Sequence, residues 1–384
     1  MQGRNSMKYS DLQADDRRRR RRIRNWIILI LVVVGVVMGI NALREFGSTR
    51  EISATALPCS AEQDVTIFGE NVLYYDGISI HCMSASGGIR WSFPVGGGAS
   101  FSASDTHLVI WAGSQLFIVD SNGKPSYNEN MNDAVQFARV KDNYCAVVIG
   151  NDTSPDLIIK SLDGTQVDEE AEAFNGMMLL DVGFYGDNDQ YLWTLAMDVY
   201  GTEINTVLNT FQVGKMNTGE VNLGEYLTYK VLYADNKLHV FTTQQMYVFD
   251  YKAVQDQSAT QLVYGWQLID SYVPPRGTSL MLLAPTAQLN GTSQTITDLR
   301  ILTANLDRRY TLPSACVGAA VQGSNLYAVS ADYLYRANVD TQRFYGYALP
   351  LPDDRQATGF VGLTNGGRAI ITSGSSVYSV TLPR

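Results

Sequence analysis

The chain has 384 residues, of which 17% are charged, and a formal net charge of −9 at pH 7. Residues 1–50 hold 11 Lys and Arg against 4 Asp and Glu, which leaves 18 basic and 34 acidic residues for positions 51–384. The excess of acidic residues at positions 51–384 argues against nucleic-acid binding through broad electrostatics. This part of the chain is long enough for one large domain or two ordinary ones.

The N-terminal segment predicts a membrane anchor. An apolar run begins at Trp26 and extends to residue 43, and it follows a block of arginines: Arg17, Arg18, Arg19, Arg20, Arg21, Arg22 and Arg24. At ~1.5 Å per residue a helix over 26–43 spans about 27 Å, close to the thickness of the hydrocarbon core. Because Lys and Arg stay on the cytoplasmic side, the arginines place the N-terminus inside and the main part outside.

This anchor divides the chain into four parts. We expect a disordered basic cytoplasmic tail at 1–25, a transmembrane signal anchor in contact with membrane lipids at 26–43, a juxtamembrane linker at 44–50 and an extracytoplasmic domain at 51–384. The residues after the apolar run show no clear small-x-small cleavage site, which favours a retained anchor over a cleaved signal peptide. The expected location is the cytoplasmic (plasma) membrane, with a single pass.

Residues 51–384 show the pattern of an all-β domain. Their apolar runs are short, rich in β-branched and aromatic residues, and separated by Gly, Asn and Asp. Pairs of such runs recur eight times, and the centres of the first runs lie 36 to 47 residues apart. The first runs of the pairs are Asn71–Gly77, His107–Trp111, Tyr144–Ile149, Gln190–Ala196, Lys237–Phe241, Ser279–Leu283, Asn325–Val329 and Arg368–Ile371.

That period is typical of the four-stranded blades of a β-propeller. Stacked β-sandwiches are the weaker alternative. Eight blades are favoured, and seven remain if two weak copies merge. The last copy has no room for a fourth strand before Arg384, so we expect Glu51–Leu57 to supply it and to close the ring, which would also bring the ring close to the membrane.

The four cysteines, Cys59, Cys82, Cys145 and Cys316, show no C-x-x-C spacing. A domain of this size does not need disulfides for its stability. Cys59 and Cys82 are the closest pair in the sequence, so a disulfide between them stays open as an alternative to free thiols. Cys145 lies inside an apolar run, which favours a buried free thiol.

The first two copies carry a resemblance to known propellers. The stretch from Met83 to Trp91 (MSASGGIRW) and the stretch from Phe117 to Asp120 followed by Gly123 resemble the repeats of propellers related to quinoprotein dehydrogenases and to the outer-membrane assembly lipoprotein of Gram-negative bacteria. With the arginine block and single anchor, the chain also resembles an uncharacterised family of membrane-anchored propellers from Gram-positive, clostridia-like bacteria. The resemblance implies the fold and no specific activity.

Catalytic and metal-binding motifs do not stand out in the sequence. His81, His107 and His239 lack metal-ligand neighbours at i+2 or i+4, and we interpret them as structural or surface residues. The calcium-like segments 120–123 and 187–189 lack the later ligands of such loops, so we interpret them as turns. Few tryptophans lie outside the anchor, which argues against a quinone cofactor, and we expect no cofactor or metal.

These features favour an interaction protein over an enzyme. The hypothesis is a non-catalytic, membrane-anchored extracytoplasmic propeller that serves as a platform for an envelope protein or a cell-wall component. The alternative is a ligand-binding sensor that holds a sugar, peptide or cation in the propeller channel. The sequence does not name the partner or the face of the ring that binds it.

Overall fold

A computed structural model describes residues 52–170, 173–198, 200–290 and 294–383. The predicted tail, the anchor at 26–43 with its arginines, Trp26 and the linker lie outside these residues. Within the described ranges no helix is long and apolar enough to cross a membrane. Residues 52–382 form one compact unit.

Antiparallel sheets make up this unit. Six of the sheets found among the described residues have four strands each. They are β2 (Asp64–Phe68), β3 (Asn71–Tyr75), β4 (Ser79–Ser84) and β5 (Ile89–Pro94); β6 (Ser100–Ala103), β7 (His107–Ala112), β8 (Gln115–Asp120) and β9 (Pro125–Asn130); β10 (Val135–Val140), β11 (Tyr144–Asn151), β12 (Ser154–Ser161) and β13 (Gln166–Glu170); β14 (Met177–Tyr185), β15 (Tyr191–Asp198), β16 (Asn205–Gln212) and β17 (Met216–Gly224); β18 (Thr228–Ala234), β19 (Lys237–Thr242), β20 (Gln245–Phe249) and β21 (Gln261–Leu262); and β29 (Gly359–Thr364), β30 (Arg368–Ser373), β31 (Ser376–Thr381) and β1 (Ala54–Ser60).

The seventh sheet has seven strands. These are β22 (Trp266–Tyr272), β23 (Leu280–Pro285), β24 (Ile296–Leu302), β25 (Asp307–Gln322), β26 (Asn325–Ser330), β27 (Tyr333–Asn338) and β28 (Phe344–Ala348), with a short helix α2 (Thr286–Leu289) between β23 and β24 and 3-10 helices at Gln257–Ala259 and Pro352–Asp354 elsewhere. The long strand β25 pairs with β24 through its first half and with β26 through its second half. The sheet therefore consists of two four-stranded halves that share β25.

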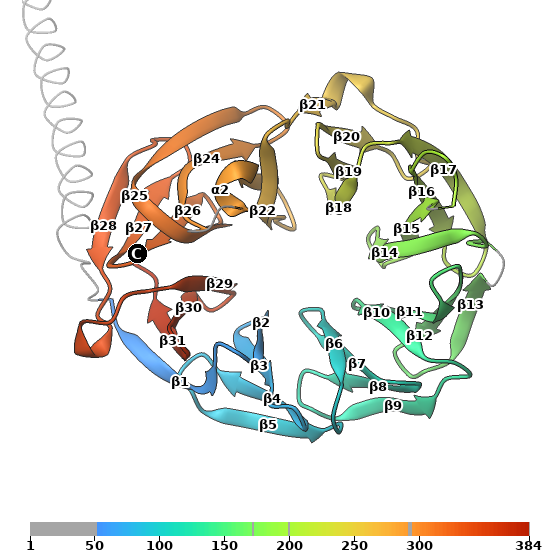
Figure 1. Ribbon diagram of the computed structural model, residues 1–384, viewed down its shortest axis with the longest axis horizontal. Coiled ribbons are helices and arrows are strands. Elements are labelled where there is room, and N and C mark those ends of the chain that lie inside the picture. The colour runs from blue at the N-terminus through green and yellow to red at the C-terminus, as the bar shows by residue number, and fades with distance from the viewer. Residues whose placement is uncertain (1–51, 171–172, 199, 291–293, 384) are drawn as a thin grey trace, which may run out of the picture. The chain divides into compact units, whose positions relative to one another are not determined.

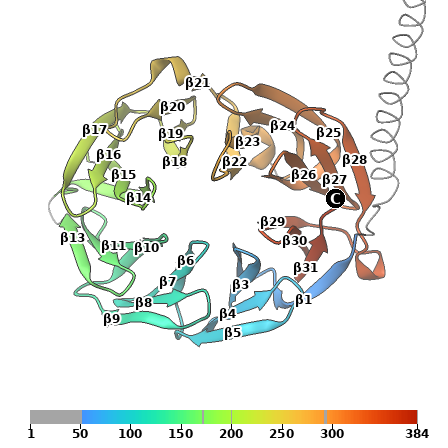
Figure 2. The same ribbon diagram turned by 180° about the vertical axis from the view of Figure 1, so that it is seen from behind.

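The sheets follow one another around a ring, with the first strand of each sheet innermost (Figures 1 and 2). The ring is closed by β1, which pairs with β31 from Ala54 opposite Val380 to Ser60 opposite Ser376. The predicted closing strand is thus confirmed, although it starts three residues later than expected. Because β1 pairs with β31, the last strand of the chain is not left as a free edge, and β1 becomes the outermost strand of this sheet.

The two middle strands of each sheet are the apolar runs that the sequence predicts. In β7 and β8 the four central residues are buried, because both faces of the sheet pack against neighbouring sheets. In the described part of the ring, eight apolar clusters lie between neighbouring sheets, and one of these clusters lies between the two halves of the seven-stranded sheet. Each fully buried aliphatic side chain contributes roughly 1.5–3 kcal/mol relative to exposure.

The fourth strand of one sheet packs on a glycine turn of the next sheet. The Trp91 ring lies against Gly123, whose φ is +80°, and Trp91 Nε1 donates a hydrogen bond to the carbonyl of Ser121 at 2.9 Å. Tyr127 takes the same place against Gly164 in the following sheet. A Cβ at Gly123 would lie 2.6 Å from the indole ring, so the turn requires glycine for its space as well as for its φ.

The turns and links between strands form two opposite faces. The hairpin face holds the turns between first and second strands and between third and fourth strands. Hydrogen bonds between neighbouring sheets connect its turns, for example from Asn365 N to Gly69 O, from Thr106 Oγ1 to Asp142 and from Ser279 N to Asp235. The connector face holds the turns between second and third strands and the links from one sheet to the next, which bond to each other, as Val263 N does to Gln244 O.

Candidate functional site

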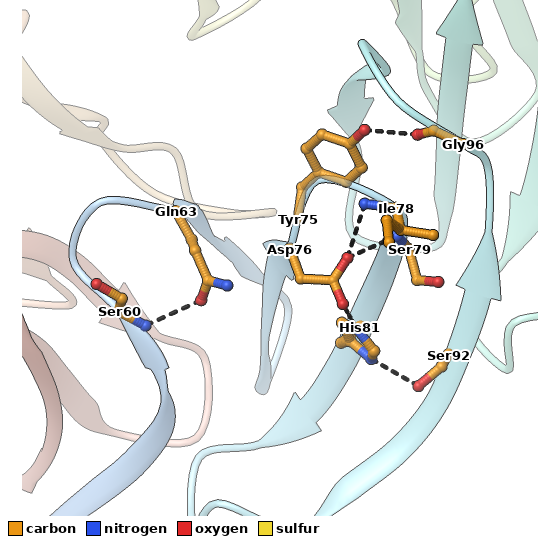
Figure 3. A network of polar contacts seen from close by, with 9 residues as sticks. All are labelled: Ser60, Gln63, Tyr75, Asp76, Ile78, Ser79, His81, Ser92 and Gly96. Atoms are coloured by element: carbon orange, nitrogen blue, oxygen red, sulfur yellow. Dashed lines mark hydrogen bonds and ion pairs between the residues drawn. The ribbon is translucent and has the colours of Figure 1, made fainter.

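A chain of polar contacts joins Asp76, His81 and Ser92 where β3, β4 and β5 reach the connector face (Figure 3). His81 and Ser92 are paired across β4 and β5, and His81 Nδ1 lies 2.7 Å from Ser92 Oγ. His81 Nε2 lies 2.8 Å from Asp76 Oδ2, in the turn between β3 and β4. The His81 ring also stacks on Tyr74, with the ring centroids 4.7 Å apart.

Asp76, His81 and Ser92 hold the residue types of a catalytic triad, but the contacts fit a structural role. Asp76 Oδ1 accepts hydrogen bonds from the backbone N–H groups of Ile78 and Ser79 and so fixes the turn. The bonds from His81, Ser79 and Ile78 lower the pKa of Asp76 to about 2. Ser92 is exposed on an outermost strand, and a nucleophilic serine needs a substrate cleft and donors for an oxyanion beside it. Ser92 lines neither the cleft between β2 and β6 nor the cleft at Asp270.

The other two histidines lie apart from each other. His107 Nδ1 lies 3.0 Å from Thr106 Oγ1 at the hairpin face. His239 is buried in β19, where its Nε2 lies 3.2 Å from the carbonyl oxygen of Ala234, and burial lowers the pKa of its ring. The described residues hold no group of three or more His, Cys, Asp and Glu side chains that could bind a metal ion.

The disulfide between Cys59 and Cys82 is absent, because the two thiols lie on opposite faces of the β2–β5 sheet. Cys82 packs with Phe68 and Ile80 toward the β6–β9 sheet, whereas Cys59 packs with Met83 and other residues on the side of the β1–β31 pair. Both are free thiols, as are Cys145 and Cys316. Burial raises the pKa of Cys59 and of Cys82 to about 11.

The segments that resemble calcium loops are turns closed by their own backbone. Asp120 Oδ1 accepts hydrogen bonds from the N–H groups of Asn122 and Lys124 at 2.9 Å each. The buried carboxylate of Asp189 accepts bonds from the backbone and side chain of Asn143 in the neighbouring sheet. These carboxylates therefore fix turns and join sheets.

Exposed apolar side chains gather around the turn between β19 and β20 on the connector face. The turn patch, which we define as Leu227, Leu262 and Tyr264, has side chains 52%, 65% and 73% exposed. Its members meet at one place, because Thr243 N bonds to Leu227 O and Val263 N bonds to Gln244 O. Sequence reasoning missed this patch, although two of its members flank Val263 in a short apolar run between strands.

Among the described residues, clefts at the innermost strands include the following two. One, of about 720 Å³, lies between β2 and β6 and is lined by polar side chains such as Thr66, Ser100 and Ser102 together with Phe101 and Trp111. The other, of about 200 Å³, is bordered by β22, α2, β24, β25 and β29 and contains Asp270. Sequence reasoning also missed Asp270, which interrupts the apolar segment of β22.

Comparison with solved structures decides the fold. Sqt1 from Saccharomyces cerevisiae is similar to this chain with a TM-score of 0.54 at 11% identity, over 86% of this chain and 100% of Sqt1. The fold is a β-propeller. BamB from Moraxella catarrhalis aligns with a TM-score of 0.49 at 11% identity, over 86% of this chain and 97% of BamB. The WD40 domain of Pan2 from Neurospora crassa aligns with a TM-score of 0.49 at 6% identity, over 86% and 96%.

At these identities the similarity concerns the fold alone. No protein-family model matches the chain, and no curated protein matches it. The function of this propeller therefore has to be argued from its own surface.

Proposed function

We propose that the chain is a non-catalytic, membrane-anchored propeller that binds an envelope protein through its connector face. The apolar segment 26–43 and the arginines before it support the anchor and an extracytoplasmic propeller. The hydroxyl groups of the larger cleft have no histidine beside them in its lining, and the described residues hold no metal-ligand cluster, which supports a binding role.

The chemistry of the connector face carries this proposal. Its described turns and links hold nine acidic side chains and only one basic one, Arg355; the acidic residues are Glu62, Asp76, Asp133, Asp152, Glu203, Glu225, Asp332, Asp353 and Asp354. On the hairpin face the numbers of acidic and basic residues are closer to each other, with ten acidic and six basic residues in its described turns. Because opposite charges steer association and fix orientation, the partner of the connector face is a protein segment rich in Lys and Arg.

The turn patch supplies the apolar part of this surface. Leu227, Leu262 and Tyr264 expose apolar area beside Glu225, and tyrosine is among the residues enriched in energetically important contacts. Arg300 fixes the backbone of the turn patch at Leu262. Its buried guanidinium donates a hydrogen bond to Leu262 O at 2.9 Å and pairs with the carboxylate of Asp307. A partner that fits this site combines apolar side chains with basic ones.

We further propose that the propeller has eight blades and is related to the quinoprotein-type propellers. The two halves of the seven-stranded sheet each have four strands, and the eight apolar clusters match eight interfaces. The contact of Trp91 with Gly123 supports the relationship to those propellers.

The test is site-specific photocrosslinking of the full-length protein in intact cells. A photoreactive phenylalanine replaces Tyr264 on the connector face or, as the matched control, Tyr345, which is 50% exposed on β28. We expect one reproducible crosslinked protein from position 264 and not from position 345. Mass spectrometry identifies the protein and the crosslinked peptide.

Two further results bear on the proposal. The crosslink at position 264 should disappear in Leu262→Glu, since a carboxylate there opposes apolar contact, and the crosslinked peptide should carry Lys or Arg beside apolar residues. Equal crosslinking from positions 264 and 345, or a crosslinked peptide that is acidic, would contradict binding through the connector face. Detection of a tag after Arg384 only in permeabilised cells would contradict the proposed topology.

A ligand-binding sensor is the second candidate. The cleft between β2 and β6 favours it, because hydroxyl groups and aromatic side chains together suit a polar organic ligand. Titration of the full-length protein with wall saccharides, read by the fluorescence of Trp111, tests this candidate. A response that survives Ser102→Leu would place the ligand elsewhere.

A further inference from the structure

The smaller cleft is a partly open cavity lined by apolar side chains and one ionisable side chain. It measures about 200 Å³, below the ~300 Å³ at which pockets for drug-sized ligands begin. Strands from both halves of the seven-stranded sheet and the first strand of the closing sheet border it, together with α2. A cavity of this volume suits a molecule with a single small ring or a short branched chain.

The side chains that line the cavity are apolar except for that of Asp270, whereas polar atoms make up nearly half of the accessible wall. Ile269, Leu289 and Phe360 supply large apolar surfaces, and Gly318 brings β25 close to Phe360. A Cβ at Gly318 would lie 2.6 Å from the Cβ of Phe360.

A bulge in β22 places Asp270 at this cavity. The pairing of β22 with β23 shifts register between Leu268 and Asp270, and such a bulge changes the direction in which a side chain points. Asp270 Oδ2 accepts a hydrogen bond from Val321 N at 2.8 Å, which joins β22 to the second half of β25. This bond holds the carboxyl group at a fixed position in the wall.

Asp270 lacks a cationic partner among the described residues. None of the five ion pairs found in them includes its carboxylate. Burial raises the pKa of Asp270, and the N–H groups of Val321 and Ser271 offset this effect in part. A partly buried carboxylate without a counter-charge is unfavourable, and a cation bound beside it removes that penalty.

We propose that this cavity binds a small organic ammonium ion, with its apolar body against Ile269, Leu289 and Phe360 and its charged nitrogen on Asp270. A carboxylate excludes anions from so small a space, and a neutral molecule of the same shape lacks the charge-assisted hydrogen bond. Inorganic cations find a single carboxylate among apolar side chains there, which is a poor set of ligands for a metal ion. The inference does not depend on the protein-binding role of the connector face.

The test is calorimetric titration of the full-length protein in detergent with benzylamine, whose ammonium form carries a six-membered ring. Benzyl alcohol, a neutral molecule of similar shape, is the matched ligand control. Asp270→Asn is the matched protein variant, because the amide oxygen still accepts the bond from Val321 N while the charge is removed. We expect benzylamine to bind the natural protein roughly tenfold or more tightly than it binds Asp270→Asn, as charge-assisted bonds imply.

Benzyl alcohol should bind both proteins equally and weakly. A second variant, Ala319→Leu, adds side-chain volume at the cavity wall and keeps the carboxylate of Asp270. It should also abolish benzylamine binding, so the test still holds if one of the two variants fails to fold. Equal affinity of benzylamine for the natural protein and Asp270→Asn would overturn the proposal. So would equal binding of benzylamine and benzyl alcohol, or no binding of benzylamine at millimolar concentration.

Discussion

The contact between Trp91 and the turn at Gly123 predicts a specific cost for adding one methyl group. Gly123→Ala places a Cβ 2.6 Å from the indole ring in a residue whose φ is +80°. The left-handed conformation alone costs alanine roughly 1–2 kcal/mol. The clash forces the ring to move, which weakens the bond to Ser121 O and adds about 1–3 kcal/mol, as overpacking does.

Gly113→Ala is the matched control, because Gly113 has a φ of +60° and no atom within 4 Å of an added Cβ. Equilibrium unfolding of residues 51–384 in urea, followed by tryptophan fluorescence, measures the free energy of unfolding of both variants. We expect Gly123→Ala to lose about 1–3 kcal/mol more than Gly113→Ala. In a Trp91→Ala background this excess loss of stability should vanish, since no indole ring is left for the added Cβ to contact. Equal costs at the two glycines, or an excess that persists without Trp91, would refute the reasoning.

Three other predictions concern closure, acid and thiols. A fragment that lacks residues 51–60 should unfold at lower urea concentration than residues 51–384, because β31 loses its partner; identical midpoints would show that β1 does not close the ring. Since the pKa of Asp76 falls to about 2 in the fold, its contribution is present above about pH 4 and lost toward pH 2, so the stability difference between the natural protein and Asp76→Asn should shrink over that window in urea titrations. If it is unchanged, the contacts with His81 and the turn do not set this pKa. Thiol titration in guanidinium without reductant should count Cys59 and Cys82 as free, and a count two thiols short would contradict the opposite-face placement.

The sequence predicted the middle strands of the propeller well, because burial on both faces makes them uniformly apolar. The run from Gln115 to Asp120 is β8 without any change of boundary. The innermost strands were not predicted: every residue of β22 is only partly buried, so it shows neither alternation nor a continuous apolar run. Tyr127 was missed as the counterpart of Trp91, since the packing against Gly164 depends on geometry between sheets.

The candidate sites depended even more on three-dimensional placement. Leu227 and Leu262 lie far apart in the chain and meet only through backbone bonds to the turn between β19 and β20. The cavity at Asp270 exists because β22, β25 and β29 come together at the inside of the ring. Alternation places Cys82 and Met83 on opposite sides of β4, but only the packing of β1 shows that Cys59 lies on the side of Met83.

Closure by β1 also delays the completion of folding during synthesis. Ser53 bonds to Thr381 across 328 positions of the chain, so the first strand has to wait for the last one to be made. At about 5–20 residues per second this delay is roughly 15–65 s. Throughout it β1 is an unpaired strand, a target for pairing with other chains. A cell that makes this protein therefore has reason to keep β1 away from other unpaired strands until β31 has been synthesised.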